Sequence, residues 1–250
     1  MGKGVFGLKE EAALARTVIK KRLAGQPAPD IWFLIILMLL VCYGLVMLFS
    51  AGYAVALYRR GDAYTYIRPQ LLFAAFGAAA MYAASLVDYH IWHKLAWPIM
   101  GVSLALLAIV LFMPEYNGCK RWIVLPGLGL GNSRQKYLYV PEPQNDFIFS
   151  ILCEELGFVG AALTVVLFLL LFLRGMSIAV RARDKFGALL AVGFVVQVVL
   201  QAVLNIAVVT NTIPNTGISL PFFSSGGTSL MMLLGEMGIV LSVSRQADAR

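Results

Sequence analysis

The chain has 250 residues, of which 60% are hydrophobic and 13% are charged, and its mean hydropathy is +0.81. Soluble domains contain about 25% charged residues, so this composition excludes a soluble globular protein and predicts a membrane protein. The formal net charge of +7 lies mostly in segments between apolar stretches, where it orients a membrane protein, and it predicts no nucleic-acid partner.

Residues 1–30 precede the first apolar stretch. The sequence "GLKEEAALARTVIKKRLAG" has the pattern of a basic amphipathic helix, which the prolines of "GQPAPD" end. A signal peptide would have an apolar core of about 7–15 residues followed by a cleavage site, whereas this apolar run begins at Ile31 and is longer. We predict a cytoplasmic tail near anionic headgroups; docking of a partner protein is the alternative.

Six apolar stretches are long enough to cross a membrane, for which a helix needs about 20 residues. They are roughly 31–57, 69–87, 95–113, 147–173, 187–209 and 227–243. The last stretch is short and contains Glu236. The sequence therefore predicts an all-α fold, a polytopic transmembrane helical bundle of about six spans, with residues 31–250 as one domain.

The distribution of Lys and Arg predicts the orientation, because cytoplasmic loops are enriched in these residues. With the N-terminus inside, the segments 1–30, 88–94, 174–186 and 244–250 hold 13 basic residues, and the outer loops hold 7. We therefore predict that both termini are cytoplasmic.

The outer segment 114–146 interrupts the membrane pattern. Its glycines lack the GKS/T ending of a phosphate-binding loop, so they predict no nucleotide site. The three cysteines of the chain lack the spacing of a metal or disulfide framework, and we predict that they fill the core. Pro141 and Pro143 flank Glu142 and predict an extended approach to the fourth span. The charged residues of the segment are Glu115, Lys120, Arg121, Arg134, Lys136, Glu142 and Asp146.

Asp146 stands at the start of the fourth span, in "PEPQNDFIFSILCEELG". One interpretation is a helix N-cap formed by Asn145 or Asp146. The other is a carboxylate, kept anionic by the helix N-terminus, that accepts a proton from a substrate hydroxyl. Glu154 and Glu155 should lie about 12–14 Å deeper. Because carboxylates in a membrane face a bundle interior or a wet cavity, we expect the fifth and sixth spans to shield them, with either a structural partner or a substrate role.

The segment 211–229, "NTIPNTGISLPFFSSGGTS", has no charge, two prolines and three glycines. Irregular backbone at membrane depth requires protein or water around it, so we predict a re-entrant or cavity-lining loop that returns beside Asp146. It would include the structural positions Pro221, Gly226 and Gly227, and it would bring the hydroxyls of Ser224, Ser225 and Thr228 toward an outer cavity. The alternative is a surface loop, which would expose two phenylalanines.

The motifs "YVPEPQNDFIFSILCEELGFVGA" and "NTGISLPFFSSGGTSLMM" resemble the SEDS family (shape, elongation, division and sporulation), to which FtsW, RodA and SpoVE belong. "NGCKRWIVLPG" and "GLGLGNSRQKYLYVPEP" are similar to two further outer-loop motifs of that family. The resemblance covers the chain from about residue 31 onward and favours the division and sporulation members.

The resemblance implies a peptidoglycan glycosyltransferase of the bacterial inner membrane that polymerises lipid II. It implies a class B penicillin-binding protein and other divisome or elongasome proteins as partners, and Asp146 as the catalytic residue. No cofactor is firmly implied, although the pyrophosphate leaves room for a divalent cation. Side chains that could bind the substrate are Lys120, Arg121, Arg134, Lys136, Glu142, Ser224, Ser225 and Thr228.

The chain departs from the family pattern near Leu125–Gly127, where two outer-loop motifs are joined directly. Family members usually have ten spans, so about four central spans are missing, an even number that preserves the orientation. Two alternatives to glycosyl transfer therefore stay open. One is a lipid II flippase or transporter that uses the uncharged loop and the buried glutamates, and the other is an inactive, shortened scaffold protein of the divisome.

Overall fold

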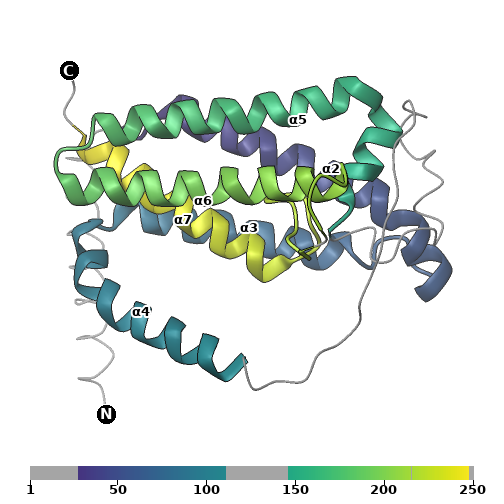
Figure 1. Ribbon diagram of the computed structural model, residues 1–250, viewed down its shortest axis with the longest axis horizontal. Helices are drawn as coiled ribbons and strands as arrows, with labels where there is room; N and C mark the ends of the chain where they lie inside the picture. Colours follow the sequence, from purple (N-terminus) through teal and green to yellow (C-terminus); the bar gives the residue numbers. More distant parts are fainter. Residues whose placement is uncertain (1–27, 111–145, 215, 248–250) are drawn as a thin grey trace, which may run out of the picture.

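The computed structural model describes residues 28–110, 146–214 and 216–247. In these ranges every regular element is an α-helix (Figure 1), which confirms the predicted all-α fold. The helices are α2 (Ile31–Arg60), α3 (Ile67–Leu86), α4 (His90–Val110), α5 (Ile148–Val180), α6 (Lys185–Val209) and α7 (Gly227–Gln246).

Five segments among the described residues are long and apolar enough to cross a membrane. They are Ile31–Tyr53, Ile67–Leu86, Ile148–Val180, Lys185–Val209 and Gly227–Gln246. The sixth predicted span, 95–113, corresponds to α4, whose last expected residues lie outside the described part of the chain. The protein is therefore a multi-pass membrane protein built from helices, as the sequence predicts.

The bundle consists of α2, α3, α5, α6 and α7, and α4 diverges from it (Figure 1). The most extensive pairings are α3 with α7 and α5 with α6. The main contact of α4 within the described residues is with α6, where the His93 ring meets the Phe186 ring edge to face. Successive helices alternate in direction. After the orientation that the distribution of Lys and Arg predicts, we call the end with residues 61–66, 146–147, 211–214 and 216–226 the outer end. The opposite end, with residues 28–30, 87–89 and 181–184, is called the inner end.

Small residues let α3 and α7 approach closely. A Cβ atom on Gly238 of α7 would collide with the backbone carbonyl oxygen of Met81, and one on Gly227 would collide with the ring of Phe73. Helix pairs in membranes rely on such contacts, because lipid tails remove the hydrophobic driving force between helices. Gly227 stands at the start of α7, and its predicted structural role stays a prediction.

A polar junction ties three helices together at the inner end. Asp30 is the N-cap of α2, and its side chain accepts a hydrogen bond from the Phe33 N–H at 3.0 Å. Arg174 of α5 donates to both carboxylate oxygens of Asp30, at 3.0 and 2.9 Å. The backbone N–H of Asp30 donates to the Ser244 hydroxyl of α7 at 3.1 Å. This paired, mostly buried charge fixes α2 against α5 and α7.

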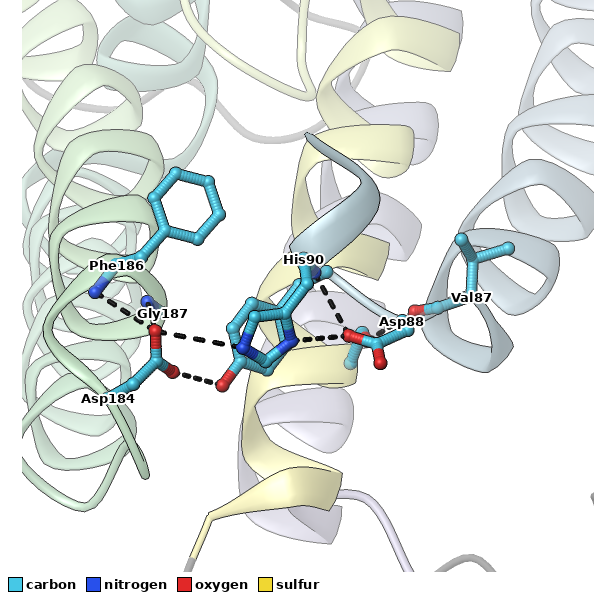
Figure 2. A network of polar contacts seen from close by, with 8 residues as sticks. Val87, Asp88, His90, Asp184, Phe186 and Gly187 are labelled. Atoms are coloured by element: carbon cyan, nitrogen blue, oxygen red, sulfur yellow. Dashed lines mark hydrogen bonds and ion pairs between the residues drawn. The ribbon is translucent and has the colours of Figure 1, made fainter. Parts of the chain in front are cut away.

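A second inner-end network joins the α3–α4 turn to the start of α6 (Figure 2). Asp184 is the N-cap of α6 and accepts hydrogen bonds from the N–H groups of Phe186 and Gly187. The buried Tyr89 donates its hydroxyl proton to the same carboxylate. The His90 ring lies between two acids, 2.7 Å from Asp88 Oδ1 and 3.9 Å from Asp184 Oδ2. The network therefore anchors the diverging α4 at its first turn.

Candidate active site

Asp146 lies at the outer end, immediately before the first turn of α5. The N-cap position belongs to Phe147, whose carbonyl accepts hydrogen bonds from the Ser150 and Ile151 N–H groups at 3.0 and 3.3 Å. The interpretation of Asp146 as the N-cap residue is therefore wrong, because the helix begins one residue later than that interpretation requires, and Asn145 lies outside the described residues. Asp146 itself is half-buried.

Asn205 of α6 holds the backbone of Asp146 against the loop that follows α6. Its Nδ2 donates to the Asp146 carbonyl and to the Ile218 carbonyl, both at 2.8 Å. Asn205 is fully buried. Gly217, next to Ile218 in the loop, also lies near Asp146, because a Cβ atom placed on Gly217 would lie 3.9 Å from Asp146 Oδ2. The predicted return of the loop beside Asp146 is thus confirmed for residues 217–218.

Two further amides fix the same loop to the bundle. Gln201 Nε2, one turn before Asn205 on α6, donates to the Ser219 carbonyl at 3.0 Å. Gln70 Nε2 of α3, which is buried, donates to the Ser224 carbonyl at 3.0 Å. The sequence reasoning missed all three amide side chains. The available signal was an uncharged polar residue inside an apolar stretch, which requires a partner at membrane depth.

The "PFF" part of the loop packs inside the bundle. Pro221, Phe222 and Phe223 are buried, and the Phe223 ring meets the Tyr43 ring edge to face at 5.3 Å. Phe222 has a φ of 66°, and its carbonyl lies so close to α2 that a Cβ atom on Gly44 would collide with it. The alternative of a surface loop is therefore wrong.

The three loop hydroxyls differ in accessibility. Ser224 is buried and its Oγ donates to the Leu220 carbonyl at 3.1 Å, so it stabilises the loop's own turn. Ser225 is half-buried, and Thr228 is exposed in the first turn of α7, which begins at Gly227 after the cap position of Gly226. Their roles in substrate binding stay predictions.

The start of α5 is not a straight continuation of the span. Gly157 has φ 62° and ψ −153°, a non-helical conformation that separates a short outer helix, 148–156, from the rest of α5. This region of the Ramachandran plot is open essentially to glycine alone. The break comes just after Glu154 and Glu155, so both glutamates belong to the short outer helix, and their predicted depth stays a prediction.

Glu155 is buried, with 1% of its surface exposed, and accepts a hydrogen bond from the Ser50 hydroxyl at 2.6 Å. The predicted shielding from lipid is confirmed for Glu155, but this hydrogen bond comes from α2, the first span, rather than from the fifth or sixth. Tyr43 of α2 also donates to the Gly160 carbonyl beyond the break, at 3.3 Å. Glu154 is half-buried. Helix α2 thus braces the break in α5 on both sides.

An open groove of about 560 Å³ runs between α6 and the loop. Gly217 borders this groove and also lies beside Asp146. Deeper in the membrane, Gln197 Nε2 donates to Glu236 Oε1 of α7 at 3.5 Å. Polar side chains therefore extend from the outer end toward the middle of the bundle. The residues that line the groove are Gln197, Leu200, Gln201, Leu204, Gly217, Ile218 and Ser219.

Several predicted substrate-binding residues lie outside the part of the chain that the structure describes. They are Lys120, Arg121, Arg134, Lys136 and Glu142. Within the described ranges no group of three or more His, Cys, Asp or Glu side chains could hold a metal ion. The roles of the basic residues and of a divalent cation therefore stay predictions.

Comparison with known proteins identifies the family. The model of the cell cycle protein family that includes FtsW, RodA and SpoVE matches residues 30–128 and 125–249. The chain belongs to this family, which confirms the resemblance seen in the motifs. The two matches meet at residues 125–128, where the sequence predicts an internal shortening.

Individual relatives support the same family. The chain is 54% identical over 119 residues to the stage V sporulation protein E of Bacillus subtilis, a match that covers 48% of this chain and 32% of that protein. It is 47% identical over 118 residues to a probable peptidoglycan glycosyltransferase FtsW of Trichlorobacter lovleyi, covering 47% of this chain and 31% of that protein. These matches span about a third of the curated relatives' length.

The fold also matches solved structures. The rod shape determining protein RodA of Thermus thermophilus aligns with a TM-score of 0.68 at 24% identity, over 89% of this chain and 99% of that one. A peptidoglycan synthase complex that coordinates polymerization and crosslinking contains a chain that aligns with a TM-score of 0.67 at 20% identity, over 87% of this chain and 98% of that one. The helical arrangement is therefore that of the family's solved members.

Proposed function

We propose that the protein is a peptidoglycan glycosyltransferase that polymerises lipid II with Asp146 as general base. The observation that carries this proposal is the position of Asp146. Asn205 links the backbone of Asp146 to that of Ile218 in the loop, and Asp146 lies beside Gly217 and the groove. A base must be held at a fixed position where a hydroxyl can reach it. Buried hydrogen bonds on its own backbone provide that rigidity.

The proposed reaction is a displacement at an anomeric carbon, with Asp146 as the group that accepts a proton. The hydroxyl of the acceptor sugar gives its proton to the Asp146 carboxylate while its oxygen bonds to the anomeric carbon of the growing chain. The bond between that carbon and the pyrophosphate oxygen breaks, and undecaprenyl pyrophosphate leaves with the bonding electrons. Positive charge beside the pyrophosphate favours this departure. Lys120, Arg121, Arg134 and Lys136 are the candidates for that charge.

The names of the relatives support the assignment of substrate and partner. FtsW proteins are named as probable peptidoglycan glycosyltransferases, and a structurally similar chain is part of a peptidoglycan synthase complex that coordinates polymerization with crosslinking. We therefore infer that this chain works beside a class B penicillin-binding protein, in the divisome or elongasome. Because the curated relatives are about three times as long as their matched segments, this inference concerns an internally shortened member.

The test is lipid II polymerisation by the purified full chain with its penicillin-binding partner. Asp146→Asn and Asp146→Ala are expected to lower the rate by about 100-fold or more, the usual contribution of a positioned base. Asp62→Asn is the matched control, because Asp62 is an outer-end acid that pairs with Arg68 on the surface. Equal rates for wild type and both Asp146 variants would refute the base assignment.

The same preparation separates the alternatives. In liposomes with labelled lipid II, translocation without polymer would indicate a transporter. Binding of the penicillin-binding partner with neither activity would indicate a scaffold. Polymer that depends on Asp146 supports the glycosyltransferase.

We infer that the protein lies in the bacterial inner membrane with both termini cytoplasmic. The bias of Lys and Arg supports this orientation, as does the position of Asp30 and Ser244, near the two ends of the described chain, in one junction. In a cysteine-free background, an impermeant maleimide added to spheroplasts is expected to label Tyr64→Cys and to spare Arg183→Cys. The reverse labelling would overturn the orientation.

A further inference from the structure

A hollow of about 490 Å³ lies at the inner end, in the turn between α5 and α6. Three of its lining residues, Ala179, Ala182 and Ala188, are alanines, and their short side chains give the hollow its depth. Val180 stands at its edge with 83% of its surface exposed. The remaining lining residues are Met176, Arg183, Asp184, Lys185 and Val192.

The rim of the hollow is cationic. Arg181, Arg183 and Lys185 are exposed within five residues of one another, and across the described ranges none of them forms an ion pair. Asp184 is the acid among them, but its carboxylate accepts hydrogen bonds from Tyr89, Phe186 and Gly187 and faces His90 (Figure 2). Four groups therefore already contact the Asp184 carboxylate, whereas the basic side chains can interact with a ligand.

The wall of the hollow is apolar and belongs to the membrane zone. Met176 and Val180 come from the last two turns of α5, and Ala188 and Val192 from the first two turns of α6. Both helices are candidate membrane spans, so the rim lies where headgroups lie and the wall where acyl chains lie. An occupant must therefore carry negative charge at one end and hydrocarbon at the other.

We propose that this hollow is a binding site for an anionic phospholipid of the inner-end leaflet. The lipid phosphate meets Arg183 and Lys185, and the upper part of one acyl chain lies against Val180, Val192 and Met176. The first N–H groups of α6 do not bind the phosphate, because Asp184 already occupies those of Phe186 and Gly187. Basic side chains near a membrane surface attract anionic lipids by roughly fivefold each. The site is far from Asp146 in the fold and does not depend on the proposed reaction.

The test is a titration of the purified full chain, in a neutral detergent, with phosphatidylglycerol and with phosphatidylcholine of equal chain length, read by native mass spectrometry. Phosphatidylglycerol is expected to bind saturably and more tightly than phosphatidylcholine. The double variant Arg183→Gln/Lys185→Gln is expected to weaken phosphatidylglycerol binding by about thirtyfold. Ala188→Leu, which keeps every charge and fills the hollow, is expected to weaken it by at least about fivefold.

The control is Arg68→Gln/Lys94→Gln, which removes the same charge from exposed positions outside the hollow and is expected to change binding less than about twofold. Three results would overturn the proposal. The first is equal weakening by the control and the rim variant, which would indicate attraction to net charge alone. The second is equally tight phosphatidylcholine binding. The third is displacement of the lipid by inorganic phosphate at the same concentration, which would indicate a site for free phosphate.

Discussion

Asn205 connects the backbone of Asp146 to the loop that follows α6. A single Nδ2 atom serves the carbonyls of Asp146 and Ile218, and the side chain is fully buried. Hydrogen bonds between membrane helices contribute about 0.6 kcal/mol on average, and up to about 1.7 kcal/mol. The amide therefore stabilises the fold and sets the position of the candidate base at the same time.

We expect Asn205→Leu to lower the free energy of unfolding by about 1–3 kcal/mol, because two carbonyls lose their donor. Polymerisation should fall as well, since Asp146 loses its backbone support. Unfolding in mixed detergent and SDS micelles measures the first effect. Gln197→Leu is the control, because that exposed amide has one long hydrogen bond, to Glu236. Equal losses in both variants would contradict the positioning role.

The sequence identified Asp146 as a candidate site residue but did not identify Asn205, for a physical reason. Asp146 stands in a long motif at a span boundary, where a carboxylate is conspicuous. Asn205 bonds to backbone carbonyls whose location depends on how the loop folds, and no side-chain pattern specifies a carbonyl partner. The spacing of Gln197, Gln201 and Asn205, four residues apart, does place them on one helix face, and this was the signal available.

At the scale of elements, the loop segment 216–226 and α2 depend on each other. The loop inserts Phe222 and Phe223 into the bundle, and α2 accommodates them because Gly44 has no side chain at the point of contact. The sequence predicted a buried loop from its lack of charge. It could not identify Gly44 as the opposing surface, because glycine in a membrane helix serves many packing contacts.

Gly44→Ala is expected to destabilise the protein by about 1–3 kcal/mol, the usual cost of overpacking, because the added methyl group would collide with the backbone carbonyl of Phe222. The loop must then shift away from α2, so polymerisation should also fall. Gly193→Ala on α6 is the matched control, since its added methyl group meets nothing within 4 Å. That variant should be neutral or stabilising by up to about 1 kcal/mol. A neutral Gly44→Ala would show that the loop does not press on α2.

At the scale of the whole molecule, the inner-end network around Asp88 and Asp184 makes the stability of the fold depend on pH. The backbone N–H of His90 donates to Asp88 and lowers the pKa of that carboxyl. Burial raises the pKa of Asp184, but hydrogen bonds from Tyr89 and from the Gly187 N–H outweigh it, and the net shift is downward. A carboxyl whose pKa is lower in the folded state stabilises the fold above its unfolded pKa, about 3.9.

We therefore expect stability to be nearly level from about pH 7 to pH 5 and to fall as the pH drops through about 4. Thermal unfolding of the detergent-solubilised protein between these values measures the slope. Asp184→Asn should flatten it by removing one titrating group. Tyr89→Phe should flatten it less, because the acid remains and loses one of the donors that lower its pKa. An Asp184→Asn profile with the wild-type slope would contradict this assignment.

The sequence predicted the five segments that are long and apolar enough to cross a membrane, because apolar length alone specifies them, and it predicted a sixth span at α4. It could not predict the divergence of α4. Trp97, Val102 and Leu104 are all well exposed, so the sequence of α4 is apolar on surfaces that contact no other described helix. The direction of such a helix depends on its neighbours and not on its own pattern.

The break at Gly157 separates the short outer helix that follows Asp146 from the rest of α5. Two hydrogen bonds fix this short outer helix. The Ser50 hydroxyl donates to the Glu155 carboxylate, and the Asn205 amide donates to the Asp146 carbonyl just before the helix. A membrane of different thickness changes the tilt of a spanning helix. Because α2 holds α5 on both sides of the break, through Glu155 and Gly160, we expect the short outer helix to keep its place while the part of α5 beyond Gly160 changes its tilt. We therefore expect the break at Gly157 to make the position of Asp146 less dependent on bilayer thickness. Polymerisation rates in bilayers of short and long acyl chains should accordingly differ less for the wild type than for Gly157→Ala.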